Sequence, residues 1–243
     1  MSIAVHPIRL SVSNAYLLVG ERPVLVDAGS KGEADAIERE MKRHGVAPGD
    51  LALIVHTHAH SDHVGASAEM LRRSGAPGAL HPADDALLAS GSNGRLNGVG
   101  LRGKAMSPIF SNLKFEPFAP SITLRDGMML TEYGLPGARI AETPGHTAGH
   151  VSVLLPDGQG IVGDVLMGGG LGGKVRPHDP RYHYFAEDLG AIHASLGKLL
   201  AETVTLWHPG HGGPLQRRDV RRWADAQGIA QGGSHDSAQE TTA

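Results

Sequence analysis

Several short apolar runs in this 243-residue chain end in turns that carry histidine or aspartate. The clearest run is LALIV at 51–55, which leads directly into HTHAHSDH at 56–63, with four histidines and one aspartate. An exposed surface has no need for so many imidazoles, and a core would have to satisfy every ring nitrogen with a hydrogen bond. The pattern therefore favours a fold in which the ends of strands meet and their polar side chains share one site.

Hydrophobic periodicity predicts two batches of strands, each followed by helices. In the first half we expect a hairpin over 15–20 and 23–29, a helix over 33–45, a strand over 51–57, a helix over 62–75 and a short strand over 78–82. In the second half we expect strands over 121–124, 128–133, 138–143, 150–156, 160–167 and 203–208, and helices over 186–201 and 216–226. Two packed sheets with helices outside would bury all of these elements. The predicted fold class is therefore α/β, an αββα sandwich of two mixed sheets flanked by helices.

We expect a single domain over residues 1–226. Residues 84–119 are rich in Gly, Asn and Arg without a clear period, which predicts an insertion or lid. A second loop rich in Gly and Pro covers 168–183, and both segments are expected to shape a pocket. Residues 227–243 are polar and poor in apolar side chains, which predicts a disordered tail.

Composition narrows the classes of partner and ligand. A net charge of -3 gives no reason to expect nucleic acid or an anionic membrane, so a small molecule is the expected partner. No run of 18 apolar residues and no export signal are present, so we expect a cytoplasmic protein. Its oligomeric state is open, with a homodimer as one option. The chain has no cysteine and 15 histidines. A metal would therefore be held by histidine and carboxylate alone.

The spacing of the histidines in 56–63 suggests metal ligands. His58 and His60 are two residues apart, so on extended backbone both side chains leave the same face and can approach one ion. Asp62 and His63 follow where the chain turns into a helix, so they point elsewhere and could hold a second ion. Zinc accepts both imidazole nitrogen and carboxylate oxygen.

Three later segments also place a candidate ligand just past a strand. They are TPGHTAGH with His146, VGD with Asp164 and PGHG with His211. His208 competes with His211, which is favoured because His208 still belongs to the strand end. Because such ends gather at one edge of a sandwich, we expect these side chains to meet those of residues 58–63. Asp27, at the end of another strand, is expected to orient the metal loop by hydrogen bonding.

With these motifs in order, the sequence resembles the metallo-β-lactamase superfamily over about residues 14–215. The resemblance rests on VLVDAG at 24–29, THAHSDH at 57–63, TPGHTAGH at 143–150, VGD at 162–164 and PGHG at 209–212. It implies the αββα metallo-β-lactamase fold with two divalent metals, zinc foremost and iron or manganese as alternatives. The implied ligands are His58, His60 and His146 for the first metal, Asp62, His63 and His211 for the second, and Asp164 as the bridge. This is the ligand set of glyoxalase II and N-acyl homoserine lactonases.

The resemblance implies a hydrolase in which a hydroxide between the two metals attacks an ester, thioester or lactone. Asp62 would be the catalytic residue that holds the nucleophile and passes a proton to the leaving group. Glyoxalase II carries a helical C-terminal region that 32 residues after His211 do not accommodate. Lactonases commonly place a tyrosine where this chain has Met167, so Tyr182 and Tyr184 become candidates for substrate binding. Arg95, Arg102 and Lys104 are either contacts for an anionic substrate or solvent-facing charges.

The sequence leaves three other functions open. A β-lactamase is an alternative that the missing export signal argues against, and an iron-dependent, persulfide dioxygenase-like enzyme is another that the second ligand set argues against. A binding protein that keeps the metal centre without catalysis is the third. We interpret six histidines as ordinary ones: His56, His81, His150, His178, His183 and His193. GGGLGGK at 168–174 lacks the Ser or Thr that a phosphate-binding loop needs next, and the arginines of 217–222 fit a solvated helix face.

Overall fold

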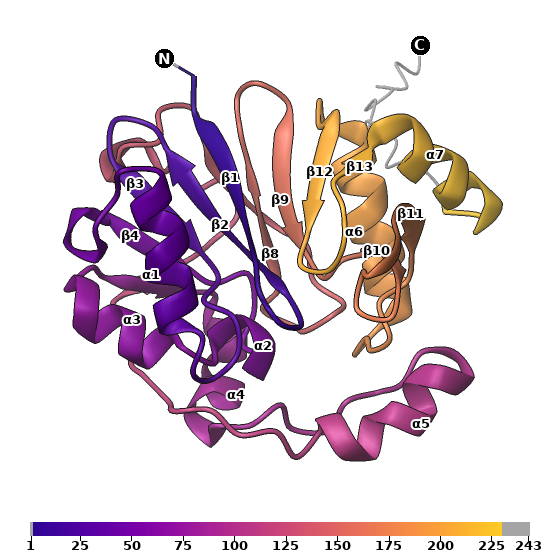
Figure 1. Cartoon of the computed structure of the whole chain (residues 1–243). Coiled ribbons are helices and arrows are strands. Elements are labelled where there is room, and N and C mark those ends of the chain that lie inside the picture. The colour runs from indigo at the N-terminus through magenta and orange to yellow at the C-terminus, as the bar shows by residue number, and fades with distance from the viewer. Residues whose placement is uncertain (1, 230–243) are drawn as a thin grey trace, which may run out of the picture.

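The chain forms two large β-sheets packed face to face, with helices on both outer sides (Figure 1). The computed structural model describes residues 2–229. The strands are β1 (Ala4–Arg9), β2 (Asn14–Val19), β3 (Pro23–Val26), β4 (Leu53–Val55), β5 (Gly78–Leu80), β6 (Ile122–Thr123), β7 (Arg139–Glu142), β8 (Val151–Leu154), β9 (Gln159–Gly163), β10 (Met167–Gly170), β11 (Val175–Arg181), β12 (Leu206–Pro209) and β13 (Leu215–Gln216). The helices are α1 (Ala34–Arg43), α2 (Ser61–Val64), α3 (Ser67–Ser74), α4 (Asp85–Ser90), α5 (Gly100–Phe110), α6 (Leu189–Ala201) and α7 (Arg217–Ala226), with short 3-10 helices at Pro48–Asp50, Pro82–Asp84 and Thr131–Tyr133.

Both sheets mix parallel and antiparallel strands, as predicted for this fold class. The first sheet has the order β1-β2-β3-β4-β5-β6, antiparallel from β1 to β3 and parallel from β3 to β6. The second has the order β13-β12-β9-β8-β7, in which β12 and β9 are parallel and the other pairs antiparallel. Because β3, β4, β9 and β12 run parallel within their sheets, the turns that follow them lie at matching ends.

Successive side chains along each strand point to opposite faces of the sheet, so they pack into an inner and an outer hydrophobic layer. In the first sheet, Leu18 and Val24 face the core between the sheets, whereas Leu17 and Leu25 face the outer core beneath α1 and α3. In the second sheet the outer residues pack under α6 and α7, and Trp207 is fully buried there. Full burial of one large aliphatic side chain contributes about 1.5–3 kcal/mol, so these three layers supply the main stabilisation.

The helix predicted over 62–75 is interrupted, and this prediction was wrong in detail. It begins one residue earlier and divides at Gly65 into α2 and α3. A side chain at Gly65 would collide with the backbone of Ser30 and Lys31, and the Gly65 N–H donates to the Gly29 carbonyl at 2.8 Å. The break therefore lets the loop after β3 pack against the turn that carries the first histidines.

Two other segments differ from the sequence prediction. Residues 128–133 form no strand, since Thr131–Tyr133 is a 3-10 helix. Residues 4–9, for which no element was predicted, form the edge strand β1, where Pro7 is tolerated because one side of the strand has no partner. Helices α4 and α5 lie within 84–119, and α5 lies at the bottom of Figure 1 at the end of an arc away from the sheets.

The loop expected over 168–183 is a β-hairpin made of β10 and β11. The glycine run fits this hairpin because the strands approach closely. A side chain at Gly168 would collide with the Pro177 carbonyl, and one at Gly173 would collide with the backbone of Gly212. The glycines of GGGLGGK therefore serve backbone packing against β11 and against the loop that carries His211.

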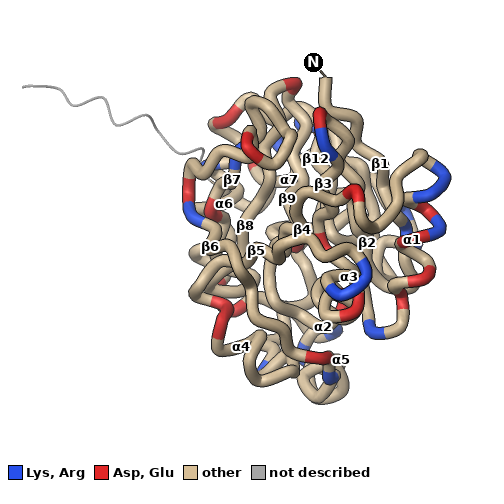
Figure 2. The backbone as a smooth tube through the Cα atoms, turned by 90° about the vertical axis from the view of Figure 1, so that its left-hand side faces the viewer, with Lys and Arg blue, Asp and Glu red and all other residues tan. Residues whose placement is uncertain are grey.

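Residues 230–243 of the predicted tail lie outside the described residues, whereas Ile229 is buried in the core beneath α7. In the part of the chain that the structure describes, no helix has the length and apolar character needed to span a membrane. Acidic and basic residues are interspersed over the surface elements in the view of Figure 2.

Candidate metal centre

The predicted ligands lie in turns at one end of the strands or in the short helix α2 that follows one of these turns. Asp27 follows β3, His58 and His60 follow β4, and Asp164 follows β9. His146 comes after β7 and His211 after β12, while Asp62 and His63 belong to α2. Segments up to 153 residues apart in the sequence thus bring seven predicted ligands, from His58 to His211, to one edge of the sandwich.

The first cluster contains His58, His60 and His146. One ring nitrogen from each residue lies within 4.8 Å of the others, and all three side chains are buried. The closest approach joins His60 Nδ1 and His146 Nε2 at 2.9 Å. Such a spacing of imidazole nitrogens suits three ligands directed at one ion.

The second cluster contains Asp62, His63 and His211, again with their ligand atoms within 4.8 Å. The Nε2 atom of His211 lies 3.3 Å from Asp62 Oδ2. Asp62 is the most accessible member, with 23% of its side chain exposed, whereas the two histidines are buried. The partial exposure leaves the Asp62 carboxylate open to a bound substrate.

Asp164 lies between the two clusters. Its Oδ2 atom is 3.3 Å from the Nε2 atoms of both His63 and His211, 3.5 Å from that of His146 and 3.9 Å from that of His58. The carboxylate therefore contacts members of both clusters, which is the arrangement that a bridging ligand requires.

The donor atoms fit divalent cations because several of them are buried without a hydrogen-bond partner. They are His58 Nε2, His63 Nε2, His211 Nε2 and Asp164 Oδ1. An unsatisfied buried polar atom costs about 1–3 kcal/mol, so four of them at one place would be hard to maintain for structure alone. Nitrogen and carboxylate oxygen together are a suitable donor set for zinc, iron or manganese.

In His58, His63 and His211 the Nδ1 atom is fixed by a hydrogen bond, which aims Nε2 at the cluster. Nδ1 of His63 lies 2.8 Å from Asp27 Oδ2, and Nδ1 of His58 lies 3.0 Å from the Thr57 hydroxyl. Thr57 in turn donates to Asp27 through both its N–H and its hydroxyl, each at 2.8 Å. Nδ1 of His211 bonds the Val12 carbonyl at 3.0 Å. Asp27 thus contacts His63 directly and His58 through Thr57.

Asp84 joins two ligand loops, and sequence reasoning missed it. Its carboxylate accepts from the Ala59 N–H at 3.0 Å, from the Thr147 hydroxyl at 2.8 Å and from the Gly149 N–H at 2.8 Å. Ala59 lies between His58 and His60, and Thr147 follows His146 directly. The only sequence signal was an aspartate at the start of a segment without periodicity, so nothing distinguished it from a surface acid.

His183 also lies beside the clusters, although its sequence context predicts an ordinary histidine. Its Nε2 atom is 3.5 Å from Asp164 Oδ2, and its ring centroid is 4.6 Å from that of His146. Together His146, Asp164 and His183 form a further group of potential ligands. The β10–β11 hairpin carries His183 back to the site, and no local motif marks that return.

The two tyrosine candidates take different positions. Tyr182 turns away, with its hydroxyl 2.7 Å from His193 Nε2 and its ring edge-on to Trp223. Tyr184 lines the cavity next to the clusters, and its hydroxyl accepts from the Leu171 N–H at 3.0 Å. Of the two, Tyr184 has access to a bound molecule.

Three histidines outside the ligand set support the site or the fold. His150 accepts from the Asp164 N–H at 2.9 Å through Nε2, and its Nδ1 bonds Thr143. His56 lies between the Ala79 carbonyl and the Ser67 hydroxyl. His208, the competitor of His211, bonds the side chain of Gln159 at 2.9 Å and is not among the clustered donors.

The pKa values of the histidines differ between the two clusters in the metal-free chain. Burial lowers the pKa of His60 to about 4, so this imidazole is neutral near pH 7. Burial would also lower the pKa of His211, but the attraction of Asp164 and Asp62 outweighs it and raises the value to about 10. A cation at the second cluster therefore competes with protons for the His211 nitrogen.

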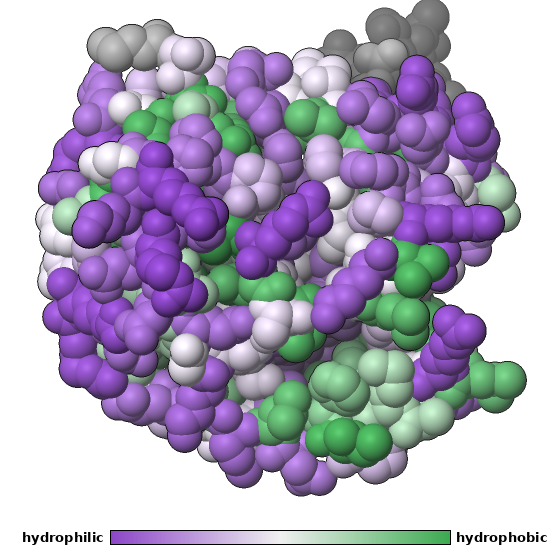
Figure 3. Space-filling view, viewed as in Figure 1, coloured by the Kyte–Doolittle hydropathy of each residue, from purple (hydrophilic) through white to green (hydrophobic). Residues whose placement is uncertain are grey.

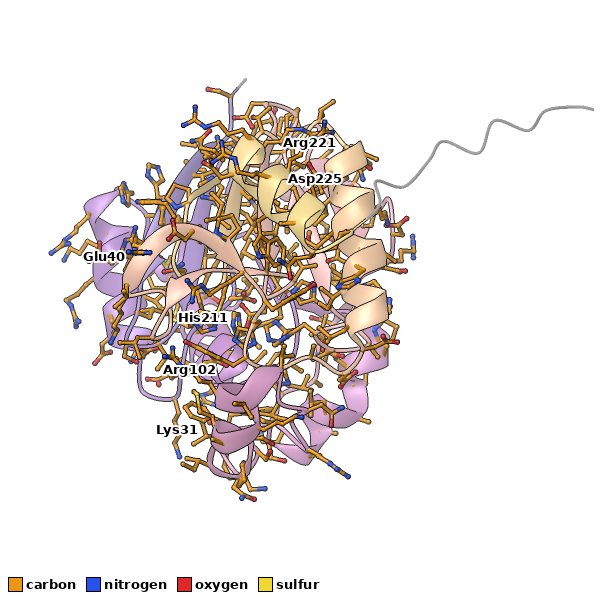
Figure 4. All side chains as sticks on the ribbon, turned by 90° about the vertical axis from the view of Figure 1, so that its right-hand side faces the viewer. Lys31, Glu40, Arg102, His211, Arg221 and Asp225 are labelled. Atoms are coloured by element: carbon orange, nitrogen blue, oxygen red, sulfur yellow. The ribbon has the colours of Figure 1, made fainter. Side chains whose placement is uncertain are left out.

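A cavity of about 440 Å³ opens above the clusters. His60, Asp62, His183 and His211 line it at one end, and residues from α5 and from the β10–β11 hairpin line its sides. Figure 4, which looks from the right-hand side of Figure 1, shows Arg102 of α5 near His211, and both residues line this cavity. In the space-filling view, hydrophobic side chains gather on both sides of a notch next to α5 (Figure 3).

Comparisons with known proteins agree with this geometry. The family model of the metallo-beta-lactamase superfamily matches residues 8–192. Probable metallo-hydrolase YqgX of Bacillus subtilis is 34% identical over 163 residues, which cover 66% of this chain and 69% of the relative. The hydroxyacylglutathione hydrolase of Acidiphilium cryptum is 28% identical over 160 residues, covering 66% of this chain and 54% of that protein.

Solved structures share the fold. TTHA1623, solved in a di-iron-bound form, is 32% identical with a TM-score of 0.65, and the match covers 89% of this chain and 97% of that one. The match is to a protein of almost the same extent, so the similarity concerns the whole sandwich and the edge at which the clustered histidines lie.

Proposed function

The chain belongs to the metallo-β-lactamase superfamily, and from that premise we propose that it hydrolyses a carboxylic ester, thioester or lactone with two bound divalent metals. The observation that carries this proposal is the pair of three-residue clusters on either side of Asp164 at the end of the cavity. One cluster alone would suit a single ion. Two clusters that share a carboxylate suit a pair.

The residues present would hold the metals as follows: His58, His60 and His146 for one, Asp62, His63 and His211 for the other, and Asp164 for both. When bound, such a pair lowers the pKa of water and polarises a carbonyl oxygen. We propose zinc, with iron or manganese as the alternatives, because a donor set of histidine and carboxylate accepts each of them. The di-iron form of TTHA1623 makes iron a specific alternative to test.

Asp62 is the residue that we propose for proton transfer. Its carboxylate belongs to the second cluster and also lines the cavity, and 23% of its side chain is exposed. A carboxylate in this position can orient an attacking water and deliver the proton to the departing oxygen or sulfur. The buried carboxylate of Asp164 has no such access.

Similarity to a known hydrolase and a shared reaction at the carbonyl carbon support the three proposed substrate classes. A thioester is supported by the similarity to a hydroxyacylglutathione hydrolase, of which this chain spans about half the length. Esters and lactones require the same attack on a carbonyl carbon, so one site can serve all three. Tyr184 lines the cavity and is our candidate for contact with the substrate.

The test combines elemental analysis of the purified protein with a panel of carboxylic ester, thioester, lactone, β-lactam and phosphodiester substrates. We expect about two metals per chain and turnover of at least one of the first three classes. His58→Ala and Asp62→Ala should lose turnover, whereas His44→Ala, an exposed histidine at the end of α1, should keep it. Turnover by metal-free protein, or by both site variants, would refute the proposal.

A further inference from the structure

We propose that the cavity selects substrates that combine an apolar arm with a negative charge several bonds from the carbonyl, and that Arg102 and Lys174 bind this charge. The inference rests on the proposed function only for the position of the reacting carbonyl, which would lie at the clustered histidines. The charge recognition itself depends on the walls and rim of the cavity.

The walls of the cavity are apolar. Six apolar side chains line it, against the polar Ser11, Asn93 and Tyr184: they are Val12, Leu96, Met106, Phe110, Leu171 and Phe185. They come from the loop before β2, from α5 with the segment before it, and from the β10–β11 hairpin with the segment after it. A cavity of about 440 Å³ with such walls takes an aliphatic or aromatic arm and excludes water from it.

Two cations stand at the rim without acids beside them. Arg102 of α5 and Lys174 of the β10–β11 turn both line the cavity and are exposed. Neither forms an ion pair with another described residue, although surface cations elsewhere do: Arg73 contacts three acids and Lys198 contacts Asp126. Asp62 is the one acid among the lining residues, and it belongs to the metal cluster.

A neighbouring hollow strengthens the positive character of this rim. It shares Val12, Asp62 and Phe110 with the cavity, and Lys31 and Lys114 lie along it. The four cations therefore lie on four segments that border two adjoining hollows. An anionic group at the opening of the cavity would meet the unpaired charges of Arg102 and Lys174, whereas a neutral group would gain nothing from them.

The first test measures binding to metal-free protein, so it does not depend on catalysis. The probes are N-dansyl-6-aminohexanoate and its methyl ester, which share the apolar part and differ in charge. At low ionic strength we expect a blue shift of dansyl emission with both, and about three- to ten-fold tighter binding of the carboxylate, since exposed ion pairs contribute modestly. Added salt should reduce the difference.

Matched variants separate the rim from general surface charge. Arg102→Gln and Lys174→Gln should each reduce the preference for the carboxylate, and the double variant should abolish it. Arg95→Gln and Lys104→Gln remove equivalent exposed charges next to the cavity but outside its lining, so they should keep it. Equal affinity for both probes, no binding of either, or the same effect in all four variants would overturn the inference.

A second measurement with metal-loaded protein identifies which part of the substrate carries the charge. Two pairs of esters are compared: a dicarboxylic acid monoester with its diester, and a neutral acyl ester with or without a sulfonate on the leaving group. We expect a lower KM for the charged member of one pair. Hydrolysis of all four esters with the same KM would refute charge selection but leave the hydrolase function intact. Tight, charge-selective binding of the probe without hydrolysis of any ester would support charge selection but count against the hydrolase function.

Discussion

Replacement of Asp84 tests how the loops of the metal centre are held. Asp84→Asn keeps the shape of the side chain but leaves one carboxylate oxygen replaced by an NH₂ group. Because Oδ2 accepts from Ala59 and Thr147 and Oδ1 accepts from Gly149, either orientation of the amide sets its NH₂ group against a backbone N–H. The variant must therefore lose at least one charge-assisted hydrogen bond and bury an unsatisfied donor.

The expected magnitude follows from these contacts. A hydrogen bond to a charged group contributes about 1.5–3 kcal/mol, and a buried unsatisfied donor costs a similar amount. Burial raises the pKa of Asp84, so desolvation of the carboxylate offsets part of what the donors contribute, and the amide is free of that penalty. We expect a net loss of about 2 kcal/mol in the free energy of unfolding. Metal affinity should fall roughly 10–100-fold, since the loops of His60 and His146 lose their common support.

Two assays check this prediction. Denaturant unfolding of the metal-free protein gives the change in stability, and competition with a chromophoric chelator gives the change in metal affinity. The matched control is Asp85→Asn, which removes the next acid along the chain, an exposed one. If Asp84→Asn unfolds at the same denaturant concentration as Asp85→Asn and binds metal equally well, the three hydrogen bonds do not hold the loops and the reasoning is wrong.

Three further predictions concern protonation and loop support. Metal binding near pH 7 should release about two protons, because the acids around His211 and His63 hold both imidazoles protonated in the metal-free chain. Calorimetry in two buffers of different ionisation enthalpy measures the number of protons released. The variant His211→Gln should release about one proton fewer than the wild type. Burial lowers the pKa of His208 to about 4, so the neutral ring contributes its full share to the free energy of unfolding above pH 6.5, and this share is lost as the pH falls toward 4. Relative to His208→Gln, the wild type should therefore lose about 2 kcal/mol in the free energy of unfolding between pH 7 and 5. A difference in urea unfolding that stays constant with pH would contradict this. Asn14→Ala should destabilise the protein by about 1–3 kcal/mol, because the Asn14 amide donates to the carbonyls of Pro209 and Gly212 on both sides of His211. It should also lower the affinity of the second metal site more than that of the first. An equal loss of affinity at the two sites in a metal titration would count against this.

Much of the sandwich could be predicted because its strands are short, apolar and separated by clear turns. The alternation in 15–26 gives the two faces of the hairpin directly, and the run at 51–55 leads to the histidines that the structure gathers. The positions just past strands also predict that His58, His146 and His211 approach one another, whereas the assignment of ligands to two metals came only from the family resemblance. The strands and turns are local in sequence, so periodicity and motif spacing suffice to predict them.

The missed features depend on contacts between distant segments. His183 reaches Asp164 only because β10 and β11 pair, and the glycine run in β10 carries no apolar pattern from which a strand could be inferred. Asp84 acts through three donors that belong to two other loops. The same holds for Tyr182, whose partner His193 lies on α6 and draws the ring away from the cavity. Sequence spacing alone does not encode such partners.

The most direct test of the metal centre is an anomalous-scattering crystal structure of the metal-loaded protein. We predict two peaks per chain, one within bonding distance of His58, His60 and His146, the other within bonding distance of Asp62, His63 and His211, with Asp164 in contact with both. A single peak, a peak away from these residues, or none after loading would contradict the proposal that the chain holds a metal pair.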